Sequence, residues 1–432
     1  MIPNLVIFGA TGDLAGRFLF PALATLRAQD QLGDQLAIIC TAPAGEADFR
    51  GHVAERLAEH AAGVPRDQRD ALIRSLRYRS ADVIDADDVA SVVRMARAGP
   101  LAVYLALPPR LFGATVPALG AAGLPKGSRV ALEKPFGEDL DSAVVLNRVV
   151  ADMAGEAGER AVFRVDHALG MATVQNVLAL RLQDPVLAAV WDTAHIEQVE
   201  VLWEENLALE GRAGYYDGTG ALKDVLQNHM LQVLCLLAME PPAGPGEREL
   251  RDAKVAVLRA ARATHSRRAR YSAGRIGDRA VPAYVDEDGV DPDRGTETFA
   301  EVALAVDTPR WRGTRFVLRA GKGLAARRKE AVVSFHGSTR LRIGIDGPCD
   351  IALELSGLGP ITLAGALPAS DLPAYGAVLL DLLEGGSTLS VRGDEAEEAW
   401  RVVMPVLDAW REQRVPLEEY PAGSGGPAQR SS

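Results

Sequence analysis

A carboxylate and an imidazole are neighbours at Asp166 and His167, and a second histidine, His229, follows further along the chain. The first pair lies in the octet Arg164-Val-Asp-His-Ala-Leu-Gly-Met171, and the second histidine closes Asp224-Val-Leu-Gln-Asn-His229. An imidazole accepts a proton near neutral pH, and a carboxylate can fix its tautomer and stabilise the imidazolium. These residue types predict an oriented general base. The structural alternative is that His229 is a core histidine on the apolar stripe of a helix.

A glycine-containing turn lies near the N-terminus. Gly9-Ala-Thr-Gly-Asp-Leu-Ala15 directly follows the apolar run 5–8, and apolar residues then recur at helical spacing. Glycines in this position let the backbone approach a pyrophosphate, which binds at the positive end of the helix. A glycine pair alone indicates only a tight turn, but its place between a strand and a helix predicts nucleotide binding.

The elements that must position these groups divide the chain into two domains. Apolar runs at 5–8, 36–40, 102–107 and 129–132 alternate with helical patterns, which predicts an α/β Rossmann-like dinucleotide-binding domain over residues 1–165. The pattern then predicts a helix over 218–237, strands near 297–306, 315–319, 331–335, 340–346, 351–355 and 361–363, and helices near 374–384 and 394–412. We therefore expect an α+β substrate and dimerisation domain with a large antiparallel sheet over 166–421, and a flexible tail over 422–432.

Composition excludes several classes of protein. The net charge of −11 argues against a general nucleic-acid binder, because nothing would offset phosphate repulsion outside a local basic patch. Three scattered cysteines, Cys40, Cys235 and Cys349, fit a reducing compartment and offer neither a disulfide framework nor zinc spacing, so no metal is expected. With no leader-like N-terminus and no apolar span of about 18 residues, the expectation is a cytoplasmic protein without a membrane partner.

Several motifs together resemble the glucose-6-phosphate dehydrogenase family, and they occur in order over nearly the whole chain. In addition to the glycine turn, the octet and the Asp224–His229 segment, they are Tyr104-Leu-Ala-Leu-Pro-Pro109, Glu133-Lys-Pro-Phe-Gly137, Glu210-Gly-Arg212 with Gly214-Tyr215, Arg319-Ala-Gly-Lys322, Arg392-Gly-Asp394 and Ala399-Trp-Arg401. The resemblance implies a Rossmann-like coenzyme domain and a second domain that dimerises through its large sheet.

The resemblance also implies an activity, namely oxidation of the C1 hydroxyl of an aldopyranose to a lactone, with hydride transfer to a nicotinamide. By resemblance, His229 is the base and Asp166 orients it. The matching substrate residues are Lys134, His167, Glu205, Asp224 and Lys322, and the matching coenzyme residues are Gly9, Thr11, Gly12, Asp13, Leu14, Thr41, Pro108 and Lys134. Each of the charged residues could instead be an ordinary solvated charge.

The sequence departs from the family pattern at the expected phosphate site. The family's phosphate grip resembles His-Tyr-Leu-Gly-Lys, whereas this chain has Ala168 and Met171 in place of the tyrosine and lysine. Loss of two charge-assisted hydrogen bonds costs about 3–6 kcal/mol unless other groups compensate. A substrate with less charge at this end is the simpler hypothesis, although Arg327 and Arg328 could replace the missing groups.

The coenzyme end departs as well. Residues Cys40-Thr-Ala-Pro43 lack the arginine with which NADP enzymes of the family hold the 2′-phosphate, and Glu46 and Arg50 lie further along. The cofactor is therefore expected to be NAD or NADP, with NAD favoured. Three functions stay open: a sugar 1-dehydrogenase with a substrate that is not 6-phosphorylated, a true glucose-6-phosphate 1-dehydrogenase with substituted phosphate ligands, and a non-catalytic binding or regulatory protein.

Overall fold

The chain forms two units in the computed structural model, which describes residues 1–33, 35–43, 48–211, 213–346, 351–358, 360–362 and 372–428. The first unit comprises Met1–Met171, Gly246–Arg251 and Ser370–Glu397, and the second comprises Ala172–Pro245, Asp252–Ala369 and Glu398–Ser432. The first unit thus extends beyond the predicted boundary at 165 and includes two later segments. Hydrogen bonds hold these two later segments in the first unit. The Arg129 guanidinium donates to the Gly386 carbonyl, and the Glu247 carboxylate accepts from the amide and hydroxyl of Ser387.

The first unit contains a doubly wound sheet, which confirms the predicted Rossmann-like fold. Its strand order is β17-β6-β5-β4-β1-β2-β3, parallel except for β17 at the edge. The strands are β1 (Asn4–Phe8), β2 (Ala37–Ala42), β3 (Leu76–Ser80), β4 (Leu101–Leu105), β5 (Arg129–Glu133), β6 (Val162–Val165) and β17 (Ser390–Val391). From β1 the chain adds β2 and β3 on one side, and it then adds β4, β5 and β6 on the other side of β1. The glycine turn after β1 therefore lies at the topological switch point, where nucleotides bind in such sheets.

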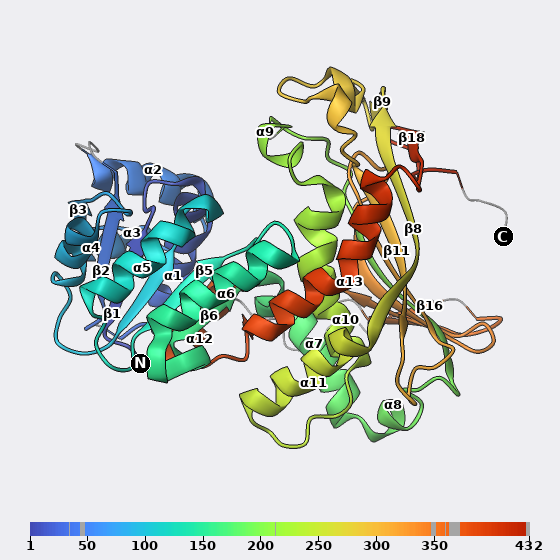
Figure 1. Cartoon of the computed structure of the whole chain (residues 1–432), viewed down its shortest axis with the longest axis horizontal. Helices are drawn as coiled ribbons and strands as arrows, with labels where there is room; N and C mark the ends of the chain where they lie inside the picture. The colour runs from blue at the N-terminus through green and yellow to red at the C-terminus, as the bar shows by residue number, and fades with distance from the viewer. Residues whose placement is uncertain are drawn as a thin grey trace. The chain divides into compact units, whose positions relative to one another are not determined.

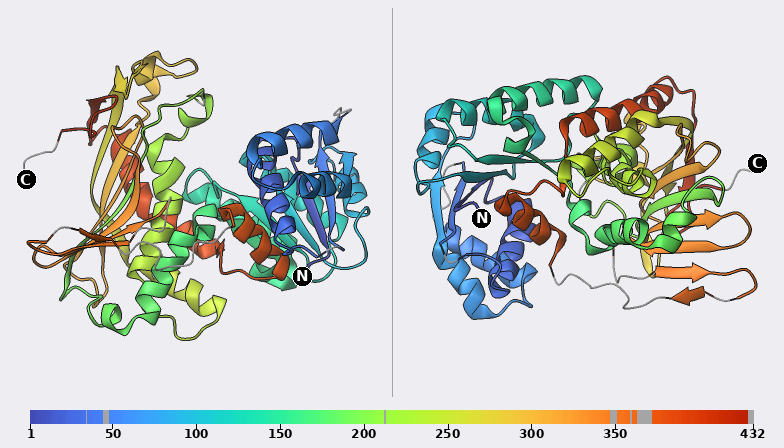
Figure 2. Two further views of the ribbon diagram at one scale, coloured as in Figure 1. Left: turned by 180° about the vertical axis from the view of Figure 1, so that it is seen from behind. Right: turned by 90° about the horizontal axis from the view of Figure 1, so that it is seen from below.

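Helices cover both faces of this sheet (Figures 1 and 2). They are α1 (Phe20–Ala28), α2 (Phe49–His60), α3 (Arg66–Ser75), α4 (Ala86–Val93), α5 (Phe112–Ala122), α6 (Leu140–Ala154) and α12 (Ala374–Glu384). Helix α6 begins with a capping box, in which the Asp139 side chain accepts from the Ser142 amide while the Ser142 hydroxyl accepts from the Asp139 amide. β1 and β4 are buried at every position, as expected for central parallel strands.

The second unit is built on a large sheet of nine described strands in the order β16-β15-β14-β13-β7-β12-β11-β8-β18. The strands are β7 (Ile196–Glu204), β8 (Ala261–Ser272), β11 (Phe299–Val306), β12 (Arg315–Gly321), β13 (Arg328–Phe335), β14 (Arg340–Gly344), β15 (Ile351–Glu354), β16 (Pro360–Thr362) and β18 (Leu417–Pro421). Most neighbouring strands are antiparallel, as expected, but β12 pairs with β7 in parallel, and β18 with β8, so the sheet is mixed. Both parallel neighbours are far apart in sequence, so no hairpin turn joins them.

One face of the large sheet carries helices (Figure 1), including α7 (Ala172–Gln183) and α10 (Leu231–Ala238). The predicted helix over 218–237 is confirmed, but its central part, η5 (Leu222–Met230), is a π-helix that continues directly into α10. The predicted C-terminal helices correspond to α12 and to α13 (Gly393–Arg411). Further elements are the helices α8 (Pro185–Ala189), α9 (Ala213–Tyr216) and α11 (Glu247–Ala260) and the hairpin of β9 (Gly274–Ile276) and β10 (Arg279–Val281).

The segment after β18 corrects the prediction of a flexible tail as far as it is described. The amide of Gly423 donates to the Gly323 carbonyl, and the amide of Ala325 donates to the Ser424 carbonyl. Residues 422–428 are therefore fastened to the sheet, although their Gly, Ser and Pro content is typical of a loose tail; residues 429–432 lie outside the described part. In the described part of the chain, no helix is both long and apolar enough to cross a membrane.

Candidate active site

The glycine turn of the first unit is shaped by two neighbouring strands. Gly9 has a φ of +81°, and a Cβ there would lie 2.2 Å from the carbonyl oxygen of Ala106. The amides of Gly9 and Ala10 donate to the Thr41 carbonyl at 2.9 and 3.0 Å. The turn is therefore fixed between β2 and the end of β4, and only glycine fits its first position.

A helix begins immediately after this turn. Helical backbone runs from Asp13 through η1 (Ala15–Leu19) into α1, so Thr11, Asp13 and Leu14 lie at its N-terminal end, where amides face outward and attract anions. This geometry fits the pyrophosphate of a dinucleotide. Asp13 is exposed and pairs with Arg17 and Arg56 at 3.4 and 3.5 Å.

Other predicted site residues, two for the coenzyme and the carboxylate that orients the base, follow the carboxyl ends of the parallel strands. Pro108 lies three residues after β4, Lys134 directly after β5, and Asp166 directly after β6. Thr41 lies within β2 and is fully buried, and its hydroxyl has no hydrogen-bond partner among the described residues. Its carbonyl fixes the glycine turn, whereas the predicted contact of its side chain with a ribose stays a prediction.

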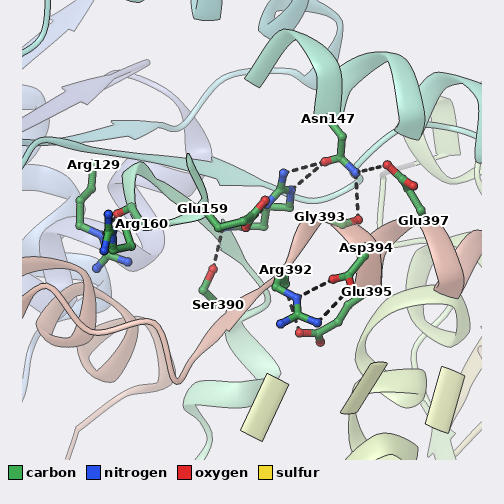
Figure 3. A network of polar contacts seen from close by, with 11 residues as sticks. Arg129, Asn147, Glu159, Arg160, Ser390, Arg392, Gly393, Asp394, Glu395 and Glu397 are labelled. Carbon is green, nitrogen blue, oxygen red and sulfur yellow. Dashed lines mark hydrogen bonds and ion pairs between the residues drawn. The ribbon is translucent and has the colours of Figure 1, made fainter. Parts of the chain in front are cut away.

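A buried arginine holds the strand that ends at Asp166. The Arg164 guanidinium donates to Asn147 of α6 at 2.6 Å and to Glu159 at 2.9 Å, and the Arg164 amide donates to the Ser390 hydroxyl at 3.1 Å. Figure 3 shows the side chain of Asn147 reaching to Gly393, whose carbonyl accepts from its amide. Arg164, the first residue of the octet, is thus structural and fixes the strand from which Asp166 and His167 emerge.

The octet then turns against helix α12. The His167 ring stacks on Tyr375, with centroids 5.2 Å apart and planes at 21°, and the tyrosine hydroxyl lies 3.5 Å from His167 Nδ1. Ala168 is fully buried, and a Cβ at Gly170 would lie 2.4 Å from the Ala374 carbonyl oxygen. Close packing on α12 therefore accounts for the glycine at position 170.

A buried carboxyl lies behind Tyr375. The Tyr104 hydroxyl donates to Glu133, and Tyr375 also hydrogen-bonds to this carboxyl group. Burial raises the pKa of Glu133 to about 7, although the bond from Tyr104 and the charge of Lys134 act in the opposite direction. Burial likewise raises the pKa of Tyr375, so its phenol keeps its proton near neutral pH. Glu133 and the two phenols thus link the ends of β4 and β5 to α12.

The second unit brings together the remaining charged residues that were predicted to bind substrate. Lys322, directly after β12, donates to Glu205 Oε2 at 2.5 Å and lies 4.0 Å from Asp224, and Glu205 directly follows β7. Because β7 and β12 are parallel and adjacent, their ends place Glu205 and Lys322 side by side. These groups line an open hollow of about 180 Å³, together with Trp203, Tyr216, Ala221, Val225, Ala320 and Gly321.

Glu205 is an anion between two lysines. The ammonium nitrogen of Lys329 on β13 lies 3.2 Å from Glu205 Oε1, whereas Lys322 donates to the other carboxylate oxygen, Oε2. Burial alone would raise the pKa of Glu205, but the charges and hydrogen bonds of Lys322 and Lys329 outweigh it and lower the pKa to about 2. Glu205 therefore only accepts hydrogen bonds, as suits a group that binds sugar hydroxyls.

His229 lies on the π-helix η5 and is buried, with 3% of its surface exposed. Its ring stacks on Trp203 of β7, with centroids 5.5 Å apart. The start of η5 is held by Glu297, whose carboxylate accepts from the Leu222 amide at 3.0 Å. Burial raises the pKa of Glu297 to about 7, although the bond from Leu222 lowers it.

The predicted site residues thus gather into two groups. The coenzyme residues, Lys134, Asp166 and His167 belong to the first unit, whereas Glu205, Asp224, His229 and Lys322 belong to the second. The predicted pairing of Asp166 with His229 stays a prediction.

Of the two arginines considered as substitute phosphate ligands, Arg327 pairs with Asp346 at 2.5 Å. Arg328 pairs with Glu204 and Glu330, both at 3.3 Å. Arg328 lies directly opposite Glu204 in the register of β13 and β7, so both side chains project to the same face of the sheet. Glu204 alternates with Trp203 and Glu205, which line the hollow, so Arg328 belongs to the opposite face.

Sequence reasoning missed the residues that support these groups. Trp203, Lys329 and Tyr216 surround the charged cluster, and Tyr104, Glu133 and Tyr375 support the octet. The basic run Arg327-Arg328-Lys329 was a usable signal, because alternation along a strand assigns the first and third of these residues to the same face.

Comparison with known proteins assigns both units to families. A family model described as glucose-6-phosphate dehydrogenase, NAD binding domain, matches residues 6–176, and one described as the C-terminal domain of that enzyme matches residues 178–345 and 362–432. The chain is 37% identical to a Treponema pallidum protein named glucose-6-phosphate 1-dehydrogenase, over 98% of this chain and 92% of the relative.

Solved structures agree with these matches. A structure of glucose-6-phosphate dehydrogenase in complex with its substrate glucose-6-phosphate has a TM-score of 0.89 at 29% identity, covering 98% of this chain and 95% of that one. A glucose-6-phosphate 1-dehydrogenase from Mycobacterium avium has a TM-score of 0.86 at 33% identity, covering 99% and 95%.

Proposed function

Because the chain belongs to the glucose-6-phosphate dehydrogenase family, we propose that it oxidises the C1 hydroxyl of glucose 6-phosphate to the lactone with reduction of a nicotinamide coenzyme. The observation that carries the proposal is the match of both units to this family, together with a charged hollow whose carboxylates and lysine suit a sugar. The family's coenzyme domain is retained with its glycine turn at the switch point, which argues against a purely structural role.

In this mechanism His229 is the general base. It takes the proton of the C1 hydroxyl as the C1–H bond breaks, and Asp166 stabilises the imidazolium that forms. Bound nicotinamide supplies the acceptor for the hydride that leaves C1 with its electron pair. Glu205 and Asp224 accept bonds from ring hydroxyls, and Lys322 donates to a sugar oxygen. The turn from Gly9 to Leu14, with Thr41, Pro108 and Lys134, would hold the coenzyme.

The phosphate end is the point at which this proposal differs from the simpler hypothesis drawn from Ala168 and Met171. The relatives' names favour glucose 6-phosphate over a sugar without phosphate. The histidine of the family's phosphate grip is retained as His167, and its ring stacks on Tyr375. The hydroxyl of Tyr375 lies beside His167 and supplies a phenol that Ala168 lacks. A non-phosphorylated aldose is the second candidate, favoured by the missing lysine at 171.

NAD is the proposed preferred coenzyme. Pro43 at the end of β2 offers no charge, and Arg50 donates to the Leu76 carbonyl at 3.1 Å instead of facing the end of the strand. Glu46, the nearest acidic residue considered for the ribose, lies outside the described residues. We also propose a homodimer formed through the large sheet, which sedimentation equilibrium of the purified protein would test.

The deciding experiment measures absorbance at 340 nm with purified protein, glucose 6-phosphate or glucose, and NAD⁺ or NADP⁺. We expect turnover with glucose 6-phosphate, and a drop in kcat of about 10²–10⁴-fold in His229→Asn with the coenzyme KM unchanged. Higher kcat/KM with glucose would select the second candidate. Absence of turnover with every aldose, or a fully active His229→Asn, would refute the proposed chemistry.

A further inference from the structure

Lys329 belongs to the face of the large sheet that carries the sugar hollow. It lies on β13, directly opposite Trp203 of β7 in the antiparallel register. Residues directly opposite each other project to the same side of a sheet, and residues two apart on a strand do so as well. The register therefore assigns Lys329, Trp203 and Glu205 to one face.

The ammonium group of Lys329 has three neighbours. It lies 3.2 Å from Glu205 Oε1, 3.0 Å from Asp346 Oδ2 and 4.4 Å from the centroid of the Trp203 ring. A lysine ammonium has three N–H groups, so two carboxylates and one aromatic face account for all of them. Lys329 is 11% exposed, and its geometry suits fixing its neighbours better than binding a ligand itself.

Lys322 differs from Lys329 in its surroundings. It lines the hollow, shares Glu205 at 2.5 Å, and has Asp224 only at 4.0 Å. Without Lys329, Lys322 would be the only described cation on Glu205, and the free Oε1 could rotate away from its present direction. Lys329 therefore determines which way the second oxygen of Glu205 points.

Trp203 links Lys329 to the catalytic region as well. Its indole contacts the ammonium of Lys329 and stacks on the His229 ring at 5.5 Å between centroids. A cation over an indole favours one ring orientation, because the attraction is strongest over the ring face. The same lysine thus restrains a wall of the sugar hollow.

We propose that Lys329 is a positioning residue that sets sugar affinity by holding Glu205 in a fixed, ionised orientation toward the hollow. This inference rests on the proposed function, in which Glu205 accepts a bond from a sugar hydroxyl. Lys329 itself touches neither substrate nor coenzyme, so its removal acts on the KM for the sugar and leaves the coenzyme KM unchanged.

The test compares Lys329→Met, Lys329→Arg and the matched surface control Lys126→Met in steady-state assays with the aldose that the wild type oxidises best. We expect Lys329→Met to raise the sugar KM about 10–100-fold with kcat within about threefold. Lys329→Arg keeps a cation on Glu205 and should recover at least half of the loss on a logarithmic scale. Lys126 is exposed, and its variant should match the wild type.

A double-mutant cycle with Glu205→Gln separates positioning from a general loss of structure. If Lys329 acts through Glu205, adding Lys329→Met to Glu205→Gln changes the sugar KM by less than threefold. Full additivity, or an unchanged KM in a folded Lys329→Met, overturns the inference while leaving the proposed function intact. A wild type that oxidises no aldose overturns both.

Discussion

Replacing Glu297 by glutamine should stabilise the second unit above neutral pH and change it little near pH 4.5. The carboxyl group is buried and accepts from the Leu222 amide at 3.0 Å, which fixes the start of η5. Burial raises its pKa from 4.5 to about 7, and the bond from Leu222 offsets only part of that effect. Glutamine keeps an acceptor oxygen for Leu222 but carries no charge.

The sign follows from proton binding. The folded protein binds this proton more tightly than the unfolded chain, so the stability present below pH 4.5 is lost as pH rises through about 7. A shift of this size corresponds to about 3 kcal/mol of unfolding free energy. The gain of Glu297→Gln over the wild type should therefore grow by about 3 kcal/mol between pH 4.5 and pH 8.

Urea unfolding at several pH values, followed by tryptophan fluorescence, measures this difference. Trp191, Trp203 and Trp311 are buried in the second unit and report its transition. As a control, Glu297→Ala removes the acceptor as well, and should cost about 1–3 kcal/mol at pH 4.5. A difference between wild type and Glu297→Gln that does not vary with pH would refute the reasoning.

Two further substitutions test the first unit. Gly9→Ala should lower the Tm and abolish the rise in Tm that NAD or NADP produces, because a Cβ would lie 2.2 Å from the Ala106 carbonyl oxygen at a φ of +81°; an unchanged Tm would contradict the assigned turn. Met171→Lys should lower the KM for glucose 6-phosphate about tenfold through one charge-assisted bond, and leave the KM for glucose unchanged. Equal changes with both sugars would mean that residue 171 does not face the phosphate.

Local patterns predicted the central strands of the first unit, because these strands are continuous apolar runs, but missed the edge strand β3, which reads Leu-Arg-Tyr-Arg-Ser. β1 and β4 are buried throughout and needed no knowledge of their partners. β8 was missed, because Ala261–Ser272 is rich in arginine and reads as a solvated segment. Its charges are matched by distant strands: Arg267, for example, pairs with Glu418 of β18 at 2.8 Å. Such pairing depends on sheet order, which no short window of sequence contains.

The candidate site shows the same division. Lys322 and His229 were found because they occur in short motifs that resemble the family's motifs. The contact of Lys329 with Glu205 depends on strand register, and the contact of Tyr375 with His167 depends on a late segment that returns to the first unit. Alternation along the strand assigns Lys329 to a face of the sheet but does not identify Glu205 as its partner, and no motif marks Tyr375. The expectation of a sugar without phosphate relied on the octet alone and gave no weight to Tyr375.

The π-helix η5 sets the rotational phase between Asp224 and His229. Five residues span about 500° in an α-helix, which would place the two side chains about 140° apart around the axis. A π-helix closes its hydrogen bonds between residues five apart, so the same pair falls about one turn apart, on the same side. Deleting one residue between positions 224 and 229 would remove the wider turn without shortening the rest of the helix. After this deletion the two side chains would be four residues apart in an α-helix, which is about 400°, so they would still lie on the same side of the axis. The wide turn therefore accommodates one extra residue while Asp224 and His229 stay on one side of the helix, whereas an α-helix of the same sequence would separate them.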